Sequence, residues 1–334
     1  MNSIHIAKLL MKLREKYPVT PENNFGELQE IFRHDLFLKA SESTKRELML
    51  KSSNAKYASE IDYPWDNYFN IDISPYLNNK IVLDLGCFNG GRGVAWFERY
   101  KFDKLFGIDI DQAFIDSAIQ FASIKGINAE YKVARGEWLP FEDATFDAIL
   151  SFDVLEHVQN VQSTLNECWR VLKPNAKLFV VFPSYFHPLE HHLSLVTRTP
   201  FFHYFFSCET LISAYNKILE ERGYDAYWYK RYSASPQSWE RCNTINGITL
   251  KKFKNMIDKK DWKIILHSRK PIGSIGRNVS KKKWPLAISY IFYPFIFIPG
   301  IQEVMLHRIT YILEKQQHCS TKKTPVNEAN SGGV

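Results

Sequence analysis

The chain has 334 residues, of which 45% are hydrophobic and 24% are charged, and its formal net charge is +7 at pH 7. These values are ordinary for a globular protein and allow a core of normal size. The five cysteines form neither a CxxC pair nor a zinc-ligand spacing, which argues against a disulfide framework and indicates free thiols in a reducing cytosol. The N-terminus lacks the apolar core of a signal peptide, so we expect a cytoplasmic protein.

The positive charge is concentrated in one segment. Residues 251–283 contain twelve Lys or Arg and two Asp, a local balance of +10, so the rest of the chain is slightly acidic. This distribution argues against a basic field over the whole protein and indicates a single basic segment.

Hydrophobic periodicity divides the chain into regions of different secondary structure. Residues 1–79 have helical spacing of apolar residues and no chemical motif, so we interpret them as a helical cap. From Lys80 onward, short apolar runs alternate with amphipathic stretches, which is typical of a parallel sheet with helices on both faces. We expect strands at 81–85, 105–108, 129–134, 146–152 and 177–182, and helices at 93–100, 112–125 and 161–172.

The regular alternation ends at Pro183. Residues 184–248 are rich in His, Tyr and Phe and predict an insertion after the fifth strand, on the substrate side of the sheet. Residues 249–316 complete an α/β, Rossmann-like, doubly wound and mostly parallel sheet of seven strands, whose core is 80–183. The polar tail at 317–334 is expected to be disordered. Within 249–316 we expect a helix at 249–257, strands at 262–268 and 307–315, and a basic and apolar insertion at 270–301.

A glycine-bearing turn follows the first strand of this core. Residues 81–91 read as a strand, a turn with several glycines and the start of a helix. Glycine in such a turn permits positive φ and lets the backbone approach a ligand closely. An acid, Asp109, ends the next strand 25 residues after Asp84, where its carboxylate can accept hydrogen bonds from both hydroxyls of a ribose. The pair predicts a nucleotide-type cofactor, although a glycine-rich turn alone is a weak signal.

Four further segments give the pattern its specificity. In order along the chain they are 137–141, 146–151, 155–158 and 167–174. With these segments in this order, the chain resembles class I S-adenosylmethionine-dependent methyltransferases of type 11, a group that includes ubiquinone-biosynthesis O-methyltransferases. The resemblance covers about 100 residues and implies S-adenosylmethionine as cofactor and methyl transfer (class EC 2.1.1) as activity.

The resemblance also implies functions for individual residues. Asp84, Gly86 and Gly90 would line the methionine end of the cofactor, Asp109 would bind the ribose and Ile110 would lie against the adenine. The cofactor-binding residues expected on this basis are Asp84, Gly86, Cys87, Gly90, Asp109, Ile110, Glu137 and Ser151.

Two positions depart from the family pattern. Phe88 stands where the family usually has glycine, so we expect the loop to take a different course there. Arg135 stands where an acidic residue often meets the adenine amino group, which changes the expected adenine contacts.

A candidate metal site follows the fourth strand. Asp153, Glu156 and His157 stand at i, i+3 and i+4, so on one helical turn they would share a face at the carboxyl end of the sheet. The spacing resembles the acid–x–x–Glu–His motif of metal-dependent O-methyltransferases that act on ribose hydroxyls or catechol-like rings. A later histidine would complete a shell for Mg²⁺ or Mn²⁺. Candidates for it lie in a second cluster of His187, Glu190, His191 and His192; the predicted ligands are Asp153, Glu156, His157 and His191.

These histidines also allow two simpler interpretations. His157, His191 or His192 could act as a plain general base that accepts the proton of an alcohol. The Glu-His pair could also serve only to support the substrate pocket, because it is common in the wider family.

A run of about 17 apolar residues, 284–300, follows the lysines at 281–283. It contains three prolines and precedes a strand that the sheet needs, which disfavours a membrane span. Two interpretations stay open: a peripheral contact of 281–300 with anionic lipid, or burial against the cap or a second subunit. Nucleic acid is a weaker candidate, since no RRM, KH or zinc motif is present.

Together these patterns predict a methyltransferase that methylates a hydroxyl on a sugar, a glycolipid or a small phenolic metabolite. An RNA ribose methyltransferase and a catalytically inactive methyltransferase-fold binding module are the alternatives. The acceptor, the methylated atom (O, N or C) and the oligomeric state are left open by the sequence.

Overall fold

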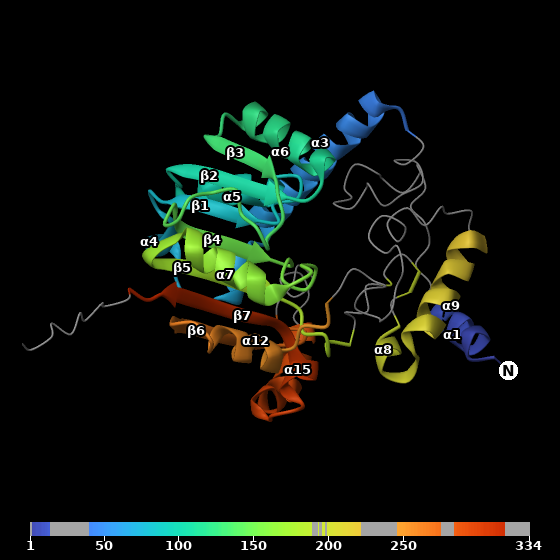
Figure 1. Cartoon of the computed structure of the whole chain (residues 1–334). Helices are drawn as coiled ribbons and strands as arrows, with labels where there is room; N and C mark the ends of the chain where they lie inside the picture. The colour runs from blue at the N-terminus through green and yellow to red at the C-terminus, as the bar shows by residue number, and fades with distance from the viewer. Residues whose placement is uncertain are drawn as a thin grey trace, which may run out of the picture.

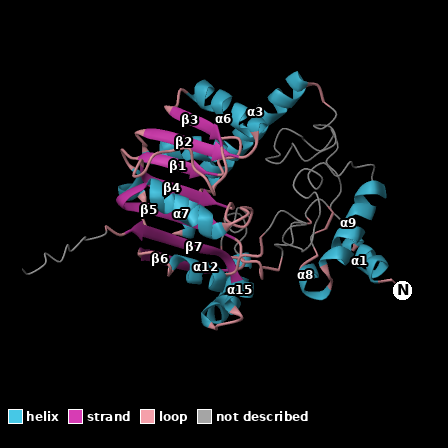
Figure 2. Ribbon diagram, in the orientation of Figure 1, coloured by secondary structure: helices cyan, strands magenta, loops and turns pink. Residues whose placement is uncertain are grey.

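The computed structural model describes residues 2–13, 40–188, 193, 196–197, 199–221, 246–274 and 284–317 (Figure 1). Its centre is one seven-stranded sheet of strand order β3-β2-β1-β4-β5-β7-β6. Strands β1 to β5 are parallel, whereas β7 runs antiparallel to both β5 and β6 (Figure 2). The predicted doubly wound, mostly parallel sheet of seven strands is therefore confirmed. The strands are β1 (Ile81–Leu85), β2 (Lys104–Asp109), β3 (Ala129–Val133), β4 (Phe146–Phe152), β5 (Leu172–Phe182), β6 (Trp262–Pro271) and β7 (Leu306–Lys315).

The helices between the strands begin and end at recognisable capping residues. Asp111 accepts a hydrogen bond from the Ala113 amide at the start of α6, and Gly126, at φ +66°, ends that helix. Asn160 caps α7 and Thr249 caps α12 in the same way. Short polar side chains at these positions satisfy amides that lack a partner inside the helix. The helices are α5 (Gly91–Tyr100), α6 (Gln112–Lys125), α7 (Val161–Val171) and α12 (Leu250–Ile257).

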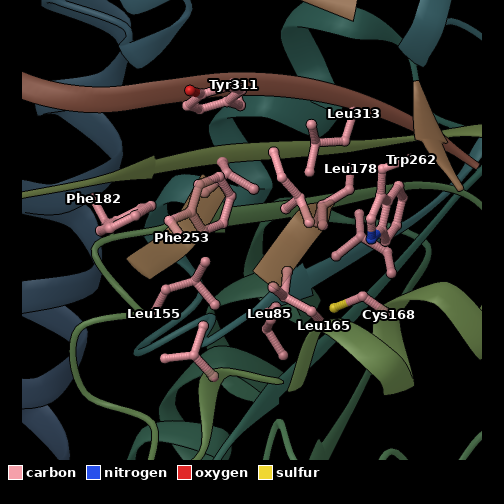
Figure 3. Close-up of a cluster of buried hydrophobic side chains, with 14 of the residues drawn as sticks. Leu85, Leu155, Leu165, Cys168, Leu178, Phe182, Phe253, Trp262, Tyr311 and Leu313 are labelled. Carbon is pink, nitrogen blue, oxygen red and sulfur yellow. The ribbon is translucent and has the colours of Figure 1, made fainter. Parts of the chain in front are cut away.

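Each face of the sheet has its own apolar core. On one face, α5 and α6 pack with the sheet through residues such as Trp96 and Phe121. On the other face, α7 and α12 contribute Leu165 and Phe253 to one cluster, in which the ring of Phe253 lies against Tyr311 of β7 (Figure 3). Because both faces are covered, the central strands are buried runs rather than alternating ones.

The N-terminal region packs in two separate places. Helix α1 (Ser3–Lys12) contacts α9 (Cys208–Glu221) and shares an apolar cluster with it. Helix α3 (Glu42–Asp62) instead lies on α5 and α6 of the sheet domain. The region predicted as one cap, 1–79, thus contributes to two parts of the molecule. The short elements of this domain are η4 (Trp65–Tyr68) and α4 (Ser74–Leu77).

The remaining elements lie at or beyond the edge where β1 to β5 end. Helix α8 (Phe202–Phe205) belongs to the predicted insertion at 184–248. The connection between β6 and β7 contains α14 (Trp284–Phe292), η5 (Tyr293–Phe297) and α15 (Gln302–Met305). Within the described ranges, no helix is long and apolar enough to cross a bilayer. Of the predicted tail, residues 318–334 lie outside the described residues.

Candidate cofactor site and acceptor edge

The glycine turn after β1 has the backbone that its sequence predicts. Gly86 has φ +70° and Gly90, the N-cap of α5, has φ +77°. A Cβ built on Gly86 would lie 2.4 Å from Cγ2 of Val154, so the space beside this turn accepts only glycine. The turn lies at the carboxyl end of the sheet, next to the loop that follows β4.

Asp109 joins the glycine turn to the end of β2. Its Oδ2 accepts a hydrogen bond from the Phe88 amide (3.0 Å), and its Oδ1 accepts one from the Asp111 amide (3.2 Å). Burial raises the pKa of this carboxyl to about 6. Each carboxylate oxygen can accept more than one hydrogen bond, so Asp109 keeps capacity for the hydroxyls of a ribose.

Asp84 ends β1 beneath the turn and is only 4% exposed. Burial raises its pKa to about 7; Arg92 opposes this shift, whereas Glu60 and Asp109 add to it. A cation bound beside Asp84, such as the ammonium group of a methionine moiety, would stabilise its ionised form.

Phe88 adopts a backbone conformation that favours glycine. Its φ is +52°, in the left-handed region, and the different course expected for the loop stays a prediction. Such a backbone costs roughly 1–2 kcal/mol for a residue with a Cβ. The ring packs on Phe114 (4.4 Å between centroids) and shares a cluster with Met49, and this packing offsets the cost.

Several buried polar atoms near the turn have no hydrogen-bond partner in the part of the chain that the structure describes. They are the hydroxyl groups of Ser151 and Tyr131 and the side-chain oxygen of Asn89. Unsatisfied buried polar atoms are costly, and they fit a site completed by a polar ligand. Together with Asp84, Asp109 and the left-handed turn, they fit the cofactor that the sequence predicts. Of the other residues predicted to contact the cofactor, Cys87 is buried and Ile110 is half exposed.

Glu137 has a visible structural function. Its Oε1 accepts hydrogen bonds from the amides of Gln159 (2.6 Å) and Asn160 (3.1 Å) and so ties its loop to the start of α7. Contact of Glu137 with the cofactor stays a prediction. Near it, Arg135 forms an isolated backbone bridge with Trp138, whose side chain is 73% exposed.

Helix α3 covers the glycine turn from the other side, a feature that the sequence did not reveal. The Ser53 hydroxyl donates to the Asn89 carbonyl (2.9 Å), and the Asn89 amide group donates to the Ser52 hydroxyl (2.9 Å). A Cβ on Gly91 would lie 2.3 Å from the Ser53 carbonyl oxygen. The turn is thus held between the sheet and α3.

A buried ion pair fixes the far end of α3. Arg92 Nε donates to Glu60 Oε1 (2.9 Å), and the Trp96 indole donates to Glu60 Oε2 (3.0 Å). Arg92 also donates to the Phe152 carbonyl (3.0 Å), and its guanidinium lies 3.9 Å from the ring centroid of Trp65. This network connects α3, α5 and the end of β4. The pair was not predictable because its partners are 32 residues apart and match no motif.

The loop after β4 does not form the predicted helical turn. Asp153 has φ +55°, and the His157 amide donates to the Val154 carbonyl (2.8 Å) in a single tight turn. Asp153 Oδ1 instead accepts a hydrogen bond from Arg308 of β7 (3.2 Å). His157 Nε2 and Glu156 Oε1 lie 3.8 Å apart. The shared helical face expected for Asp153, Glu156 and His157 is therefore wrong.

The predicted metal shell is not assembled in the described ranges, which contain no group of three or more His, Cys, Asp or Glu side chains able to hold an ion. Glu190, His191 and His192 lie outside the described residues, so the functions predicted for His191 and His192 stay predictions.

The loop after β4 is also fixed by Asn246, which the sequence gave no reason to single out. Its amide group donates to the carbonyls of Leu155 (2.7 Å) and Val158 (2.8 Å).

Two histidines meet at the same edge of the sheet. His187, which is 6% exposed, lies against His307 with 6.1 Å between ring centroids. His307 in turn lies 5.9 Å from the ring of Tyr68, whose hydroxyl has its pKa raised by burial. His307 was expected only as the start of a strand. The imidazoles of His187 and His307, which can accept a proton, thus lie at the same edge of the sheet as Arg308 and Asp153.

Part of the chain is similar in sequence to known proteins. Residues 83–180 match the family model described as "Methyltransferase domain". Norajmaline N-methyltransferase of Rauvolfia serpentina is 30% identical over 140 residues, covering 41% of this chain and 47% of that protein. Ubiquinone biosynthesis O-methyltransferase of Bartonella tribocorum is 32% identical over 111 residues, covering 33% and 43%.

Solved structures are similar at lower identity. A protein from Methanosarcina mazei described as a SAM-dependent methyltransferase is 20% identical, with a TM-score of 0.42, covering 73% of this chain and 96% of that one. The chain spans less than half the length of the two curated relatives described above. Over residues 83–180, the chain is thus similar to methyltransferases.

Proposed function

We propose that the chain is an S-adenosylmethionine-dependent methyltransferase. The observation that carries the proposal is a pair of carboxylates, the buried Asp84 and the half-buried Asp109, placed on either side of a left-handed glycine turn at the carboxyl ends of β1 and β2. Asp109 binds the ribose hydroxyls, and Asp84 lies at the methionine end. When bound, the cofactor supplies an electrophilic methyl group, so the main task of the protein is to position the acceptor.

We further propose that the acceptor is a hydroxyl on a sugar, a glycolipid or a small phenolic metabolite. The relatives include an N-methyltransferase and O-methyltransferases, so their names do not decide the methylated atom. An alcohol needs a group that takes its proton, whereas a neutral amine does not. The contact of His187 with His307 at this edge of the sheet supports the hydroxyl, because an imidazole nitrogen can accept the proton of an alcohol.

Isothermal titration with S-adenosylmethionine tests the first proposal. We expect Asp109→Ala to weaken cofactor binding by about 100-fold, because two buried amide partners and the ribose hydroxyls lose their acceptor. Asp116→Ala is the matched control; this exposed carboxylate of α6 bonds only to Gln112 in the described part of the chain, and its removal should leave the affinity unchanged. If the wild-type chain has no affinity, the chain is a binding module that only has the methyltransferase fold.

Labelled S-adenosylmethionine and a panel of glycan, lipid and phenolic acceptors test the second proposal. We expect methyl transfer to a hydroxyl acceptor that falls at least tenfold in His307→Ala while cofactor affinity is retained. Transfer only to amines would contradict the proposed acceptor. Repeating the assay with a chelator tests the metal predicted from the sequence: activity that is lost and then restored by Mg²⁺ would support it, and unchanged activity would leave a histidine as the base.

A further inference from the structure

The connection between β6 and β7 exposes an unusual amount of apolar surface. Seven of its described residues, Ile301 (40%) among them, are between 40% and 70% exposed, and each is an aromatic residue or isoleucine. We call this the 286–301 surface. Its most exposed members are Tyr290 (70%), Ile291 (65%), Tyr293 (51%), Phe297 (51%), Ile298 (42%) and Phe295 (40%). Contiguous exposed apolar groups on this scale mark an interaction site.

The backbone of the 286–301 surface is held in place by buried contacts with the sheet domain. Ile296 is fully buried in the core on the α7 face, between the exposed Phe295 and Phe297. Glu303 Oε2 accepts hydrogen bonds from the Ser184 hydroxyl (2.6 Å) and the Leu250 amide (2.8 Å). At its base the Ile272 amide donates to the Met305 carbonyl (2.8 Å). The backbone is therefore fixed while neighbouring apolar side chains point outward.

The charge around the surface is strongly one-sided. From residue 269 to residue 308, which includes the whole connection, the sequence has seven Lys or Arg and one acid, Glu303, which is 8% exposed and already bonded. Arg269 lies 5.4 Å from the ring centroid of Phe297. A second copy of the chain docked about a two-fold axis would bring these like charges together. A layer of anionic headgroups over an apolar interior instead satisfies both the charge and the apolar side chains.

The position of the surface connects it with the acceptor edge. Because β7 runs antiparallel to β5, the residues just before Leu306 lie at the edge where β1 and β4 end (Figure 1). Arg308, two residues into β7, bonds to Asp153 at the end of β4 (3.2 Å). A bilayer bound to the 286–301 surface would therefore lie beside the site of methyl transfer.

We propose that the 286–301 surface docks the protein on an anionic lipid bilayer as a peripheral contact. Its aromatic and isoleucine side chains enter the boundary between headgroups and acyl chains, while the adjacent basic residues contact the headgroups. A second part of the proposal rests on the proposed function: the methyl acceptor is an amphiphile that reaches the carboxyl end of the sheet from the lipid bilayer.

Vesicle sedimentation of the full chain tests the docking without any methyl transfer. We expect binding to vesicles of phosphatidylcholine with 30% phosphatidylglycerol, and at least tenfold weaker binding to phosphatidylcholine alone or in 0.5 M salt. The double substitution Tyr290→Ser with Ile291→Ser should weaken binding at least tenfold. Ile124→Ser on α6 is the matched control, because Ile124 is as exposed as Ile291 (65%). Equal binding by the double variant and the wild type would overturn the proposal.

Two further measurements separate the other outcomes. Analytical ultracentrifugation of the wild type is expected to give a monomer; a dimer that the double variant abolishes would assign the surface to a second copy and overturn the lipid proposal. Cofactor affinity of the double variant should equal that of the wild type, so a failure to bind S-adenosylmethionine in both proteins would refute the proposed function without touching the docking. Equal activity of the wild type and the double variant on an acceptor carried in vesicles would refute the proposed delivery of the acceptor from the bilayer.

Discussion

The carboxyl edge of the sheet has two halves that are held in place in different ways. Around β1 and β2, the turn after Leu85 is fixed by nearby groups: the carboxylate of Asp109 and the hydroxyls of α3. Around β4 and β7, the contacts join residues far apart in the chain, such as Arg308 with Asp153 and Asn246 with Leu155. The half proposed to bind the cofactor is thus held by contacts within residues 52–109. The half proposed to bind the acceptor, here called the acceptor half, depends on contacts between segments 91 and 155 residues apart. Substitutions should separate the two halves.

The largest effect is expected at the ion pair below α3. Glu60→Ala leaves Arg92 without its buried carboxylate partner, which should lower the free energy of unfolding by about 3–5 kcal/mol. Urea denaturation measures this loss. Glu60→Gln keeps one acceptor oxygen, for either Arg92 or the Trp96 indole, and should cost less than Glu60→Ala. The exposed Glu47→Ala should stay within about 0.5 kcal/mol of the wild type. An equally small effect for Glu60→Ala would contradict the conclusion that this ion pair holds α3 against the sheet domain.

The next effect concerns the approach of α3 to the glycine turn. Gly91→Ala introduces a Cβ only 2.3 Å from the Ser53 carbonyl oxygen, so helix and turn must separate. We expect a loss of about 1–3 kcal/mol in unfolding free energy, as for other overpacked sites. Gly126→Ala is the comparison: it has φ +66° and nothing within 4 Å of the new Cβ, so its backbone cost should leave cofactor affinity unchanged. Calorimetric titration should show weaker cofactor binding for Gly91→Ala alone.

On the acceptor half, the ion pair between Arg308 and Asp153 should affect catalysis without affecting cofactor affinity. Arg308→Met should lower kcat with a hydroxyl acceptor about tenfold, because the loop after β4 loses its link to β7. Lys263→Met, which removes an exposed ion pair with Glu314, is the matched control on β6 and should be neutral. Steady-state kinetics together with titration calorimetry distinguish the two effects. Weaker cofactor binding in Arg308→Met would show that the two halves are coupled.

The smallest effect is a pH dependence on the cofactor half. Burial raises the pKa of Asp84 to about 7 and that of Asp109 to about 6, so the free protein holds protons that the unfolded chain has released. The stability from these two groups is fully present below about pH 4 and is lost as pH rises through 6 to 7. Cofactor binding favours the ionised carboxylates, so its affinity should rise a few-fold between pH 5.5 and pH 8. Titration calorimetry at several pH values measures it, and Asp84→Asn should flatten the profile.

Local signals in the sequence predicted the sheet domain well. Helix α6 has the predicted bounds because Asp111 caps its start and Gly126 ends it, and both signals are adjacent to the helix. The strand at 146–152 was also correct, because an apolar run of that length between turns reads as a buried strand. These features need no information from distant parts of the chain.

At the candidate site, the positive φ of the glycine turn follows from the sequence, whereas the loop after β4 differs from its prediction, and the predicted cofactor contacts stay predictions. The spacing of Asp153, Glu156 and His157 favoured a helical turn, but the positive φ of Asp153 and its bond to Arg308 produce a tight turn instead. The approach of His307 to His187 arises because β7 returns beside β5, which no local pattern indicates. Contacts between segments far apart in the sequence determine the structure of the acceptor half, and hydrophobic periodicity does not predict such contacts.

The pairing of β6 with β7 has a consequence for how such a protein can change. The two strands stay in register as far as Pro271 and Leu306, where the intervening segment leaves and re-enters the sheet at one point. Lengthening or shortening a connection of this kind costs little in loop-closure entropy. Evolution can therefore exchange the 286–301 surface for a short hairpin, or the reverse, without altering the methyl-donor half. Whether the proposed methyl transfer takes place at a lipid surface or in bulk water could therefore change through this one connection, while the proposed cofactor site stays the same.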